Sequence, residues 1–394
     1  MMNYRSCFVI ACVAHLAGCS EPSFDEAQFT IAWEYEIPMA ERAMVLDDPI
    51  RQTHHLAFDN ENRLYVVLSR LPDPEAKQGC AAILKFAADG TRLETLPFDR
   101  SQPPVQPFEV CPPREFIGID GADAILTGSD RIIGNDNGET YNDLFLRKLD
   151  GQGKSIWTQY HYGAVGYSSY FQDLAIDPQN NIILAATGGP LNGTSTPWIG
   201  KYDPQGNLLW THEVATFIDA IDVDEKGNIW YLFGDDASND TLLGKLDPAG
   251  NSLVTIPLES SGPGLLELAP DGSPVLYFYS STIKKYSTDG ALLWETTPGF
   301  YLGNPRGDLY KDTRRIAVGP DGSVYGIGDG IGSNCNCGLE PPPATILIKY
   351  GADDGRMVGY WVRRFGSGSM DMIIGKNGAM AVIDTSIWVT KPLE

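Results

Sequence analysis

The sequence is poor in positive charge and in histidine. It has 29 Lys and Arg against 51 Asp and Glu, a formal net charge of −22 at pH 7, and 5 His. Such an acidic surface argues against nucleic acid and anionic lipid patches as partners, and is typical of a chain that charge keeps soluble. The sequence also lacks the Gly-x-Ser-x-Gly, phosphate-loop and dinucleotide-binding patterns, so it gives no sign of the enzymes that use them.

Long apolar runs are missing as well, which excludes a membrane-spanning helix on length. The apolar run at residues 7–16 follows Arg5 and has the length of a signal-peptide core. It ends in LAGC at residues 16–19. This motif resembles the lipobox of bacterial lipoproteins, in which cleavage precedes the Cys and acyl chains such as palmitate are attached to it. An ordinary secretory signal is the alternative.

The lipobox resemblance implies a signal peptide over residues 1–18, a lipidated Cys19 and a short tether over residues 19–28. Several acyl chains would anchor the protein stably to a membrane. Because Ser20 rather than Asp follows the Cys, the resemblance favours the outer membrane of the cell envelope.

Cysteine is scarce beyond this point: Cys80, Cys111, Cys335 and Cys337 follow. In an envelope compartment an even number suggests disulfides, and four cysteines allow three pairings. We pair Cys80 with Cys111, whose loops are expected to be neighbours, which leaves Cys335 with Cys337. A redox pair or a metal-ligand pair at Cys335 and Cys337 is the alternative, although zinc sites usually have at least two residues between such ligands.

An internal repeat of paired hairpins fills most of the chain. The first half-unit, two apolar alternations around a turn, occurs at residues 55–69, 116–129, 173–187, 220–234, 265–280, 315–330 and 371–384. The second half-unit follows each of them, at residues 83–98, 146–160, 199–214, 243–258, 283–298 and 346–362, and begins a seventh time at 386–392.

Both half-units have the chemistry of β-hairpins. Their turns contain Asp-Pro-x-Gly or Pro-Asp-Gly, in which Pro presets φ and Gly takes a positive φ. Their flanks alternate with period two and are rich in branched and aromatic residues. Seven units of four strands predict an all-β, seven-bladed β-propeller over residues 29–394. A large β-sandwich assembly is the alternative.

The segment FTIAWEYEIP, residues 29–38, has no partner strand near it in the sequence. It resembles the last strand of the second half-unit, with Trp33 where Trp157, Trp210 and Trp294 stand. Because the seventh unit lacks that strand, we predict that residues 29–38 supply it and close the ring between the two ends of the chain.

Two family resemblances follow from these repeats. DLFLRKLDGQGKSIW, residues 143–157, and RIAVGPDGSVYGIGDG, residues 315–330, resemble the SBBP-type repeats of bacterial envelope propellers. This resemblance covers most of residues 29–394 and implies a fold, but no catalytic residues. YDPQGNLLW, residues 202–210, is similar to the tryptophan-docking repeats of quinoproteins and of a propeller lipoprotein of the outer-membrane barrel-assembly machine. Those repeats usually have Thr-Gly in the turn and often eight blades, which this sequence does not match.

The loops are expected to differ between the two faces of the propeller. Turns inside the hairpins are short, whereas the connections at residues 69–80, 99–113, 129–143, 160–172, 298–313 and 330–343 are long. Function usually lies on such a decorated face. Aromatic residues there could contact an envelope protein or a glycan: Tyr162, Tyr167, Tyr170, Phe300 and Tyr301. Packing within the loops themselves is the alternative.

A second candidate site is the mouth of the central channel, where the innermost strands begin. The polar residues expected there are His54, His55, Glu115, Asp173, Asp219, Arg314, Arg315 and Asp371. They form no known motif, so polar residues facing a water-filled channel explain them equally well. Adjacent His54 and His55 point to opposite faces of a strand, and one of them at most can serve such a site.

The loops at residues 134–139 and 234–240 are acidic and have the oxygen ligands that Ca²⁺ prefers, but neither matches the twelve-residue calcium loop. No other cofactor is expected. The sequence therefore favours a non-catalytic binding or scaffold propeller, anchored in the bacterial envelope and making contacts through its long-loop face. The alternative is an envelope enzyme, a lactonase-like metal-dependent hydrolase or a lyase, with its site at the channel mouth.

Overall fold

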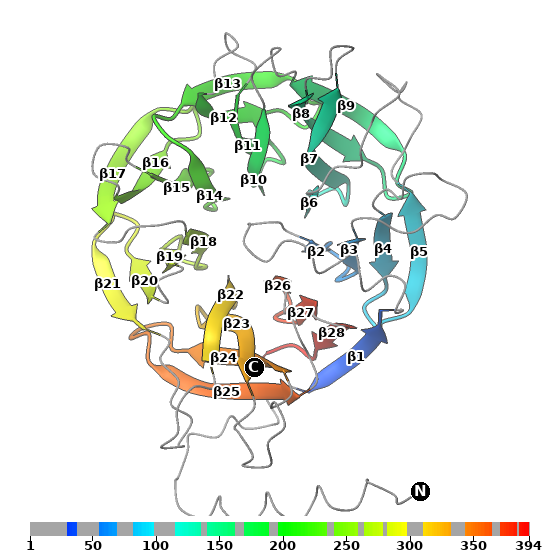
Figure 1. The fold of residues 1–394 in the computed structure, drawn as a ribbon, viewed down its shortest axis with the longest axis vertical. Helices are drawn as coiled ribbons and strands as arrows, with labels where there is room; N and C mark the ends of the chain where they lie inside the picture. The colour runs from blue at the N-terminus through cyan, green and yellow to red at the C-terminus, as the bar shows by residue number, and fades with distance from the viewer. Residues whose placement is uncertain are drawn as a thin grey trace, which may run out of the picture.

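The structure is a computed structural model. It describes residues 30–37, 55–68, 82–97, 115–134, 140–161, 169–188, 196–234, 240–258, 264–278, 282–297, 310–331, 343–364, 371–383 and 386–393. These residues form seven four-stranded antiparallel sheets arranged as blades around a central axis (Figure 1). The predicted seven-bladed β-propeller is confirmed. Within the described ranges no helix is long and apolar enough to cross a membrane.

Each blade contributes two strands to the inner half of the ring. The innermost strands, in blade order, are β2 (Leu56–Phe58), β6 (Glu115–Ile119), β10 (Tyr170–Ile176), β14 (Ile218–Val223), β18 (Gly264–Leu268), β22 (Tyr310–Val318) and β26 (Asp371–Ile374). Next to them lie β3 (Leu64–Leu68), β7 (Ile125–Gly134), β11 (Ile182–Thr187), β15 (Ile229–Gly234), β19 (Pro274–Phe278), β23 (Val324–Ile331) and β27 (Met380–Ile383).

The outer half of each blade completes the sheet. The third strands are β4 (Ala82–Phe86), β8 (Thr140–Leu149), β12 (Pro197–Tyr202), β16 (Thr241–Leu246), β20 (Thr282–Tyr286), β24 (Pro343–Tyr350) and β28 (Ser386–Thr390). The outermost strands are β5 (Arg92–Pro97), β9 (Ser155–His161), β13 (Leu208–Glu213), β17 (Ser252–Leu258), β21 (Leu292–Thr296), β25 (Met357–Arg364) and, for blade 7, β1 (Ile31–Glu36).

The N-terminal strand closes the ring, as predicted. Strand β1 pairs antiparallel with β28, with Trp33 opposite Val389 and Tyr35 opposite Ile387. Trp33 and Tyr35 also pack on Phe86 of blade 1, with ring centroids 5.4 and 5.1 Å apart. One six-residue strand therefore completes blade 7 and covers the seam between blades 7 and 1.

The hydrophobic core is divided among the seams between blades. Seven clusters of buried side chains each draw on two neighbouring blades, so every blade-to-blade contact has its own core. This arrangement follows from the alternation of each strand, because both faces of a blade lie against a neighbour and both must be apolar.

Many of the short turns begin with an aspartate and contain one residue in the left-handed conformation. In the outer turn of blade 3, Asp203 Oδ1 accepts hydrogen bonds from the backbone N–H groups of Gln205 and Asn207 at 2.9 and 2.8 Å. Gly206 supplies the positive φ, 86°. The equivalent inner turns of blades 1, 2 and 3 use Asn62, Asp123 and Asn180 instead, with φ between 58° and 64°.

Tryptophans of the outermost strands dock on the next blade. The indole N–H groups of Trp157, Trp210 and Trp294 donate to backbone carbonyls in the outer turn of the following blade, at 3.0–3.2 Å. Trp33 does the same to Ala88 at 3.1 Å, so the predicted equivalence of the four tryptophans is confirmed. The docking geometry is therefore present although the turns lack Thr-Gly.

A lysine on the third strand also forms a hydrogen bond across the seam to the next blade. Lys85, Lys148, Lys201, Lys245 and Lys285 each donate from Nζ to an outer-turn carbonyl of the next blade at 3.2 Å. In blade 6, Lys349 instead pairs with Asp321 of its own blade at 3.3 Å. Blade 7 has no outer turn that could offer Lys349 a carbonyl, because its third and outermost strands come from opposite ends of the chain and no turn connects them.

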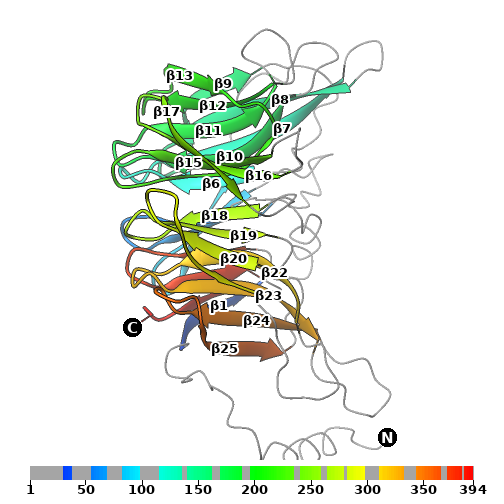
Figure 2. The same cartoon turned by 90° about the vertical axis from the view of Figure 1, so that its left-hand side faces the viewer.

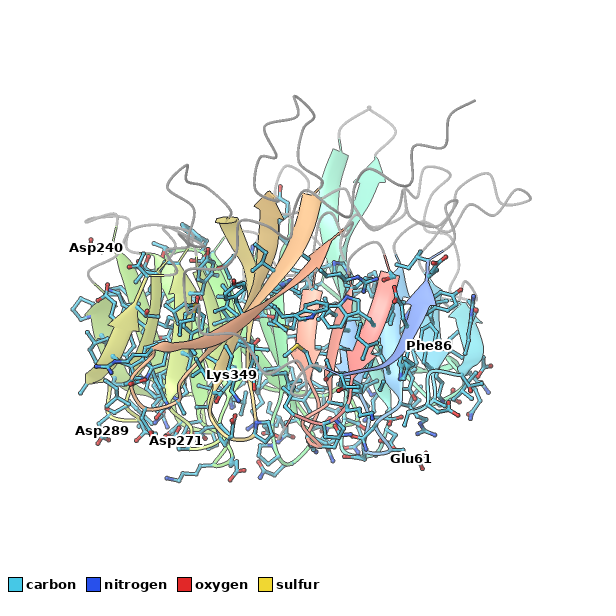
Figure 3. The ribbon with its side chains drawn as sticks, turned by 90° about the horizontal axis from the view of Figure 1, so that it is seen from below. Glu61, Phe86, Asp240, Asp271, Asp289 and Lys349 are labelled. Carbon is cyan, nitrogen blue, oxygen red and sulfur yellow. The ribbon has the colours of Figure 1, made fainter. Side chains whose placement is uncertain are left out.

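The two faces of the ring differ in the length of their connections. The tight turns lie on one side of the ring, and the strand ends that the longer connections join lie on the other side (Figure 2). On the tight-turn side lie the acidic residues Glu61, Asp271 and Asp289 (Figure 3). Strands β7 and β8, ten residues each, rise above their neighbours on the long-loop side.

Candidate functional site

The innermost strands begin on the long-loop face, and the predicted channel-mouth residues that the structure describes lie in these strands or directly beside one. His55 directly precedes β2, and Asp173, Asp219, Arg315 and Asp371 lie in β10, β14, β22 and β26. His54 lies outside the described residues. Glu115 and Arg314 belong to β6 and β22, but their side chains are outside the described part of the structure.

Asp173 joins blade 3 to blade 4. Its side chain is buried. Oδ1 accepts a hydrogen bond from the backbone N–H of Leu174 at 2.8 Å, and Oδ2 accepts one from Ile221 of β14 at 2.8 Å. The free edge of an innermost strand carries N–H groups without a ladder partner. The carboxylate satisfies one such group on each side of the seam.

Asp371 makes the same bridge from blade 7 to blade 1 and adds a cation. Oδ1 accepts from the N–H of Met372 at 2.9 Å and Oδ2 from the N–H of His55 at 2.6 Å. Arg315 Nε of blade 6 lies 3.3 Å from Oδ1, and both side chains are buried. This carboxylate therefore ties three consecutive blades together at the channel.

Asp222 is a third bridge, which the sequence analysis missed. Its carboxylate accepts from the N–H of Val223 at 2.7 Å and from the N–H of Leu268 in β18 at 2.8 Å. The sequence does contain one indication of Asp222: it is an acid at a position of the innermost strand where blades 1 and 3 have Ala57 and Ala175. This signal identifies an unusual residue, but not its partner in the next blade.

Asp219 lies at a β-bulge, where the register between β14 and β15 shifts from Ile218 to Ala220. A bulge re-aims the side chain of the residue that it leaves out of the ladder. Burial raises the pKa of Asp219 to about 7, and a hydrogen bond with the backbone of Gly264 in blade 5 opposes the shift. Asp219 is thus a carboxyl that changes charge near neutral pH.

His161 is a buried histidine at the end of β9. Its Nε2 lies 2.8 Å from the hydroxyl of Tyr202, and burial lowers its pKa to about 4. The ring is therefore neutral at pH 7, and it shares one hydrogen bond with the Tyr202 hydroxyl. This imidazole is fixed in the packing between blades 2 and 3, beside Trp198.

The described channel residues are arranged to hold blades together. The carboxylates of Asp173, Asp222 and Asp371 each bind two backbone N–H groups in different blades. Within the described ranges, no group of three or more His, Cys, Asp or Glu residues is placed to hold a metal ion. Asp173 and Asp371, on blades 3 and 7, are not brought together with each other.

Most of the residues predicted for the long-loop face lie outside the described part of the chain. These are Cys80, Cys111, Cys335, Cys337, Tyr162, Tyr167, Phe300 and Tyr301, and the predicted lipidation site, Cys19, lies outside the described residues as well. Tyr170 is described: it begins β10 and is 37% exposed on that face. Of the two acidic loops, Gly134, Gly234 and Asp240 are described and the residues between are not.

Comparison with known proteins places the chain by fold. No family model matches it, and no curated protein does. Among solved structures, the WD40 domain of Neurospora crassa Pan2 is similar with a TM-score of 0.57 at 9% identity, covering 93% of this chain and 96% of that one. A puromycin hydrolase mutant gives 0.51 at 13% identity, covering 90% of this chain and 53% of the hydrolase.

A virginiamycin B lyase from Staphylococcus aureus gives a TM-score of 0.47 at 11% identity, covering 85% of this chain and 94% of the lyase. At these identities the likeness concerns the propeller fold alone. This chain spans about half the length of the hydrolase.

Proposed function

We propose that this protein is a lipid-anchored binding or scaffold propeller of the bacterial cell envelope, which contacts a protein or glycan partner through its long-loop face. The anchor is the lipobox cysteine, Cys19, and the repeats are of the SBBP type. The observation that carries the proposal is the asymmetry of the ring. One face is closed by tight, hydrogen-bonded turns, whereas the strand ends that the longer connections join all lie on the other face.

The direction of β1 supports one orientation on the membrane. An outermost strand runs from the tight-turn face toward the long-loop face, and β1 pairs with β28 in that sense, beginning at Ile31 opposite Thr390. A lipidated Cys19 would reach the ring from the tight-turn face. Eleven residues separate Cys19 from Ile31, and they span at most about 40 Å when extended. The long-loop face would then point away from the membrane.

The bridging role of Asp173 and Asp371 also favours binding over catalysis at the channel mouth. A catalytic or metal-ligating carboxylate needs an oxygen directed at the substrate or the ion. Both oxygens of each carboxylate instead accept backbone hydrogen bonds in two blades. The long-loop face is therefore the better candidate for a contact surface.

The anchor is tested with a Cys19→Ser variant expressed beside the natural chain. The natural chain is expected in the membrane fraction after cell lysis, and the variant in the soluble fraction. Membrane retention of Cys19→Ser at the natural level would contradict the lipid anchor.

The contact surface is tested with a photo-crosslinking residue at position 170 in intact cells, and with a matched probe at position 289 on the tight-turn face. The proposal expects a discrete protein or glycan adduct from position 170, competed by excess soluble propeller, and none from position 289. Adducts from position 289 alone, or from neither position, would overturn the proposal.

A further inference from the structure

Two aromatic side chains are exposed on the long-loop face, where innermost strands begin. Tyr170 begins β10 of blade 3 and is 37% exposed, and Phe217 directly precedes β14 of blade 4 and is 50% exposed. Within the described ranges, the other exposed large apolar side chains are aliphatic or Met, and each lies at the first or second position of an outermost strand. Tyr170 and Phe217 therefore differ from these rim residues both in place and in chemistry.

The two aromatic residues occupy equivalent positions in neighbouring blades. Tyr170 stands opposite Thr187 at the end of β11. The carbonyl of Phe217 accepts a hydrogen bond at 3.3 Å from the N–H of Gly234, at the end of β15. Strands β10 and β14 lie side by side around the channel (Figure 1). The two side chains are therefore neighbours on one stretch of the long-loop face.

Phe217 is held in its exposed position. The Thr216 hydroxyl donates to the carbonyl of Gly234, and the Gly234 N–H donates to the carbonyl of Phe217. A Cβ atom built on Gly234 would lie 3.2 Å from Cε1 of Phe217, so the lack of a side chain at Gly234 leaves room for the ring. An apolar ring that is fixed in place and still faces water has little freedom left to lose when a partner binds.

A polar side chain accompanies the aromatic pair. The register between β10 and β11 shifts at Gln172, and such a bulge re-aims the side chain that it leaves out of the ladder. Gln172 is half-buried, and its amide N–H group donates to the Thr187 hydroxyl at 3.5 Å. Its carbonyl oxygen has no hydrogen-bond donor among the described residues. Asp219, at the corresponding bulge of blade 4, is engaged by the backbone of Gly264 and is not part of this group.

This combination of groups suits a sugar. A pyranose ring has an apolar C–H face, which packs on an aromatic ring, and hydroxyl groups at its edge, which donate and accept hydrogen bonds. The amide of Gln172 and the phenol of Tyr170 each offer both a donor and an acceptor. Equatorial hydroxyl groups, as in β-1,4-linked glucose or N-acetylglucosamine, leave both faces of the ring apolar. The net charge of −22 disfavours an anionic ligand, so a neutral saccharide is favoured over an acidic one.

We propose that Tyr170, Gln172 and Phe217 bind a neutral saccharide with equatorially substituted pyranose rings, which pack on the two aromatic side chains. The partner of the long-loop face is then a glycan, and this assignment rests on the function proposed above. A stable protein interface buries roughly 1,000 Å² or more, whereas two aromatic side chains and one amide match one or two sugar rings.

The experiment titrates the full chain, purified in a detergent without a sugar headgroup, and follows binding by calorimetry. The probes are cellotetraose, chitotetraose and the tetramer of β-1,4-linked glucuronic acid. Saturable binding of cellotetraose or chitotetraose, at least about tenfold tighter than binding of the anionic tetramer, is the expected result. No saturable binding of either neutral tetramer up to millimolar concentration, or equal affinity for the anionic one, would overturn the proposal.

Matched variants locate the site. Phe217→Ala removes one aromatic surface and is expected to weaken binding of the neutral tetramer about tenfold, whereas Phe217→Trp keeps a ring and should retain binding. Leu209→Ala removes a rim side chain of similar exposure, 52%, and should have no effect. Circular dichroism and thermal melting establish that each variant is folded. Unchanged affinity in a folded Phe217→Ala protein would contradict the assignment.

Crosslinking at position 170 in intact cells separates a failure of the saccharide site from a failure of the contact face. A discrete protein adduct, without binding of either neutral tetramer, would overturn the saccharide and leave the long-loop face as the contact surface. The absence of both an adduct and tetramer binding would overturn both.

Discussion

Trp33 lies directly against Gly90: a Cβ atom built on Gly90 would be 2.4 Å from the indole Cγ of Trp33. The indole N–H also donates to the carbonyl of Ala88, in the same turn, at 3.1 Å. Trp33 belongs to the first described strand, and Gly90 belongs to the first blade. Their contact closes the ring, and it uses the same docking that joins the blades in the middle of the chain.

We predict that Gly90→Ala destabilises the whole propeller. Gly90 has φ of 85°, where an Ala costs about 1 kcal/mol. Displacing the indole should cost about 1–3 kcal/mol more. The free energy of unfolding in urea measures the sum, which should be about 2–4 kcal/mol.

Gly272→Ala is the matched control for this substitution. Gly272 has a similar φ of 79°, but a Cβ there meets no atom closer than 3.5 Å. The loss in free energy of unfolding of Gly272→Ala should therefore reflect only the unfavourable positive φ of an Ala residue. If the two variants lose equal stability, the docking of Trp33 contributes nothing to closure.

Substitution of the seam lysine Lys201 is predicted to destabilise the protein strongly. Its buried ammonium lies 2.8 Å from Asp177 Oδ2 and donates to the carbonyl of Pro248 at 3.2 Å. Lys201→Met leaves Asp177 as a buried charge without its partner, which costs about 3–5 kcal/mol. The exposed Lys226, changed to Met, should cost less than about 0.5 kcal/mol. Equal effects of the two substitutions on urea unfolding would contradict the role of Lys201.

The ion pair of Lys201 and Asp177 predicts that the free energy of unfolding depends on pH in the acidic range. Burial acts to raise the pKa of Asp177, but hydrogen bonds from Lys201 and Asn181 outweigh it and hold the pKa below its ordinary value. The pair's contribution is therefore fully present above the ordinary carboxyl pKa and is lost as the pH falls through the lower, folded value. Unfolding measured from pH 5 to pH 2 should show a smaller acid loss in Lys201→Met than in the natural chain.

The titration of Asp219 should change the stability in the opposite direction to that of Asp177, so that stability falls as the pH rises. Its folded pKa of about 7 lies above its unfolded value, so the folded state holds the proton more tightly and loses stability as the pH rises from about 4 through 7. Asp219→Asn removes this loss. At pH 8 the free energy of unfolding of the variant should exceed that of the natural chain by on the order of 1–3 kcal/mol. At pH 4 the two values should differ little. A constant difference between the two proteins across this range would contradict the raised pKa.

The repeats in the sequence were sufficient to predict the blades and the closure of the ring. Turn residues and period-two alternation act locally, so their effect on structure can be read within each unit. The position of Trp33 in the repeat predicted that β1 would complete blade 7, because Trp157, Trp210 and Trp294 stand at the same position.

Contacts across the seams could not be read in this way. A lysine recurs on the third strand of most repeats, but its acceptor is a backbone carbonyl in the next blade. Asp173 and Asp371 were correctly expected on the innermost strands, yet their partners are backbone N–H groups. A backbone group has no signature in sequence, so a bridging acid and a metal-binding acid look alike there.

The central claim is that the described channel carboxylates hold the blades together. Its most direct test is the free energy of unfolding of Asp371→Asn and of the natural chain, each measured with EDTA and with added Ca²⁺ or Zn²⁺. Asn keeps one acceptor oxygen but weakens the bonds to His55 and Arg315, so we expect a loss of about 2–4 kcal/mol that is the same in every condition. A natural chain that EDTA destabilises and metal restores, with an Asp371→Asn variant that responds to neither, would contradict the account.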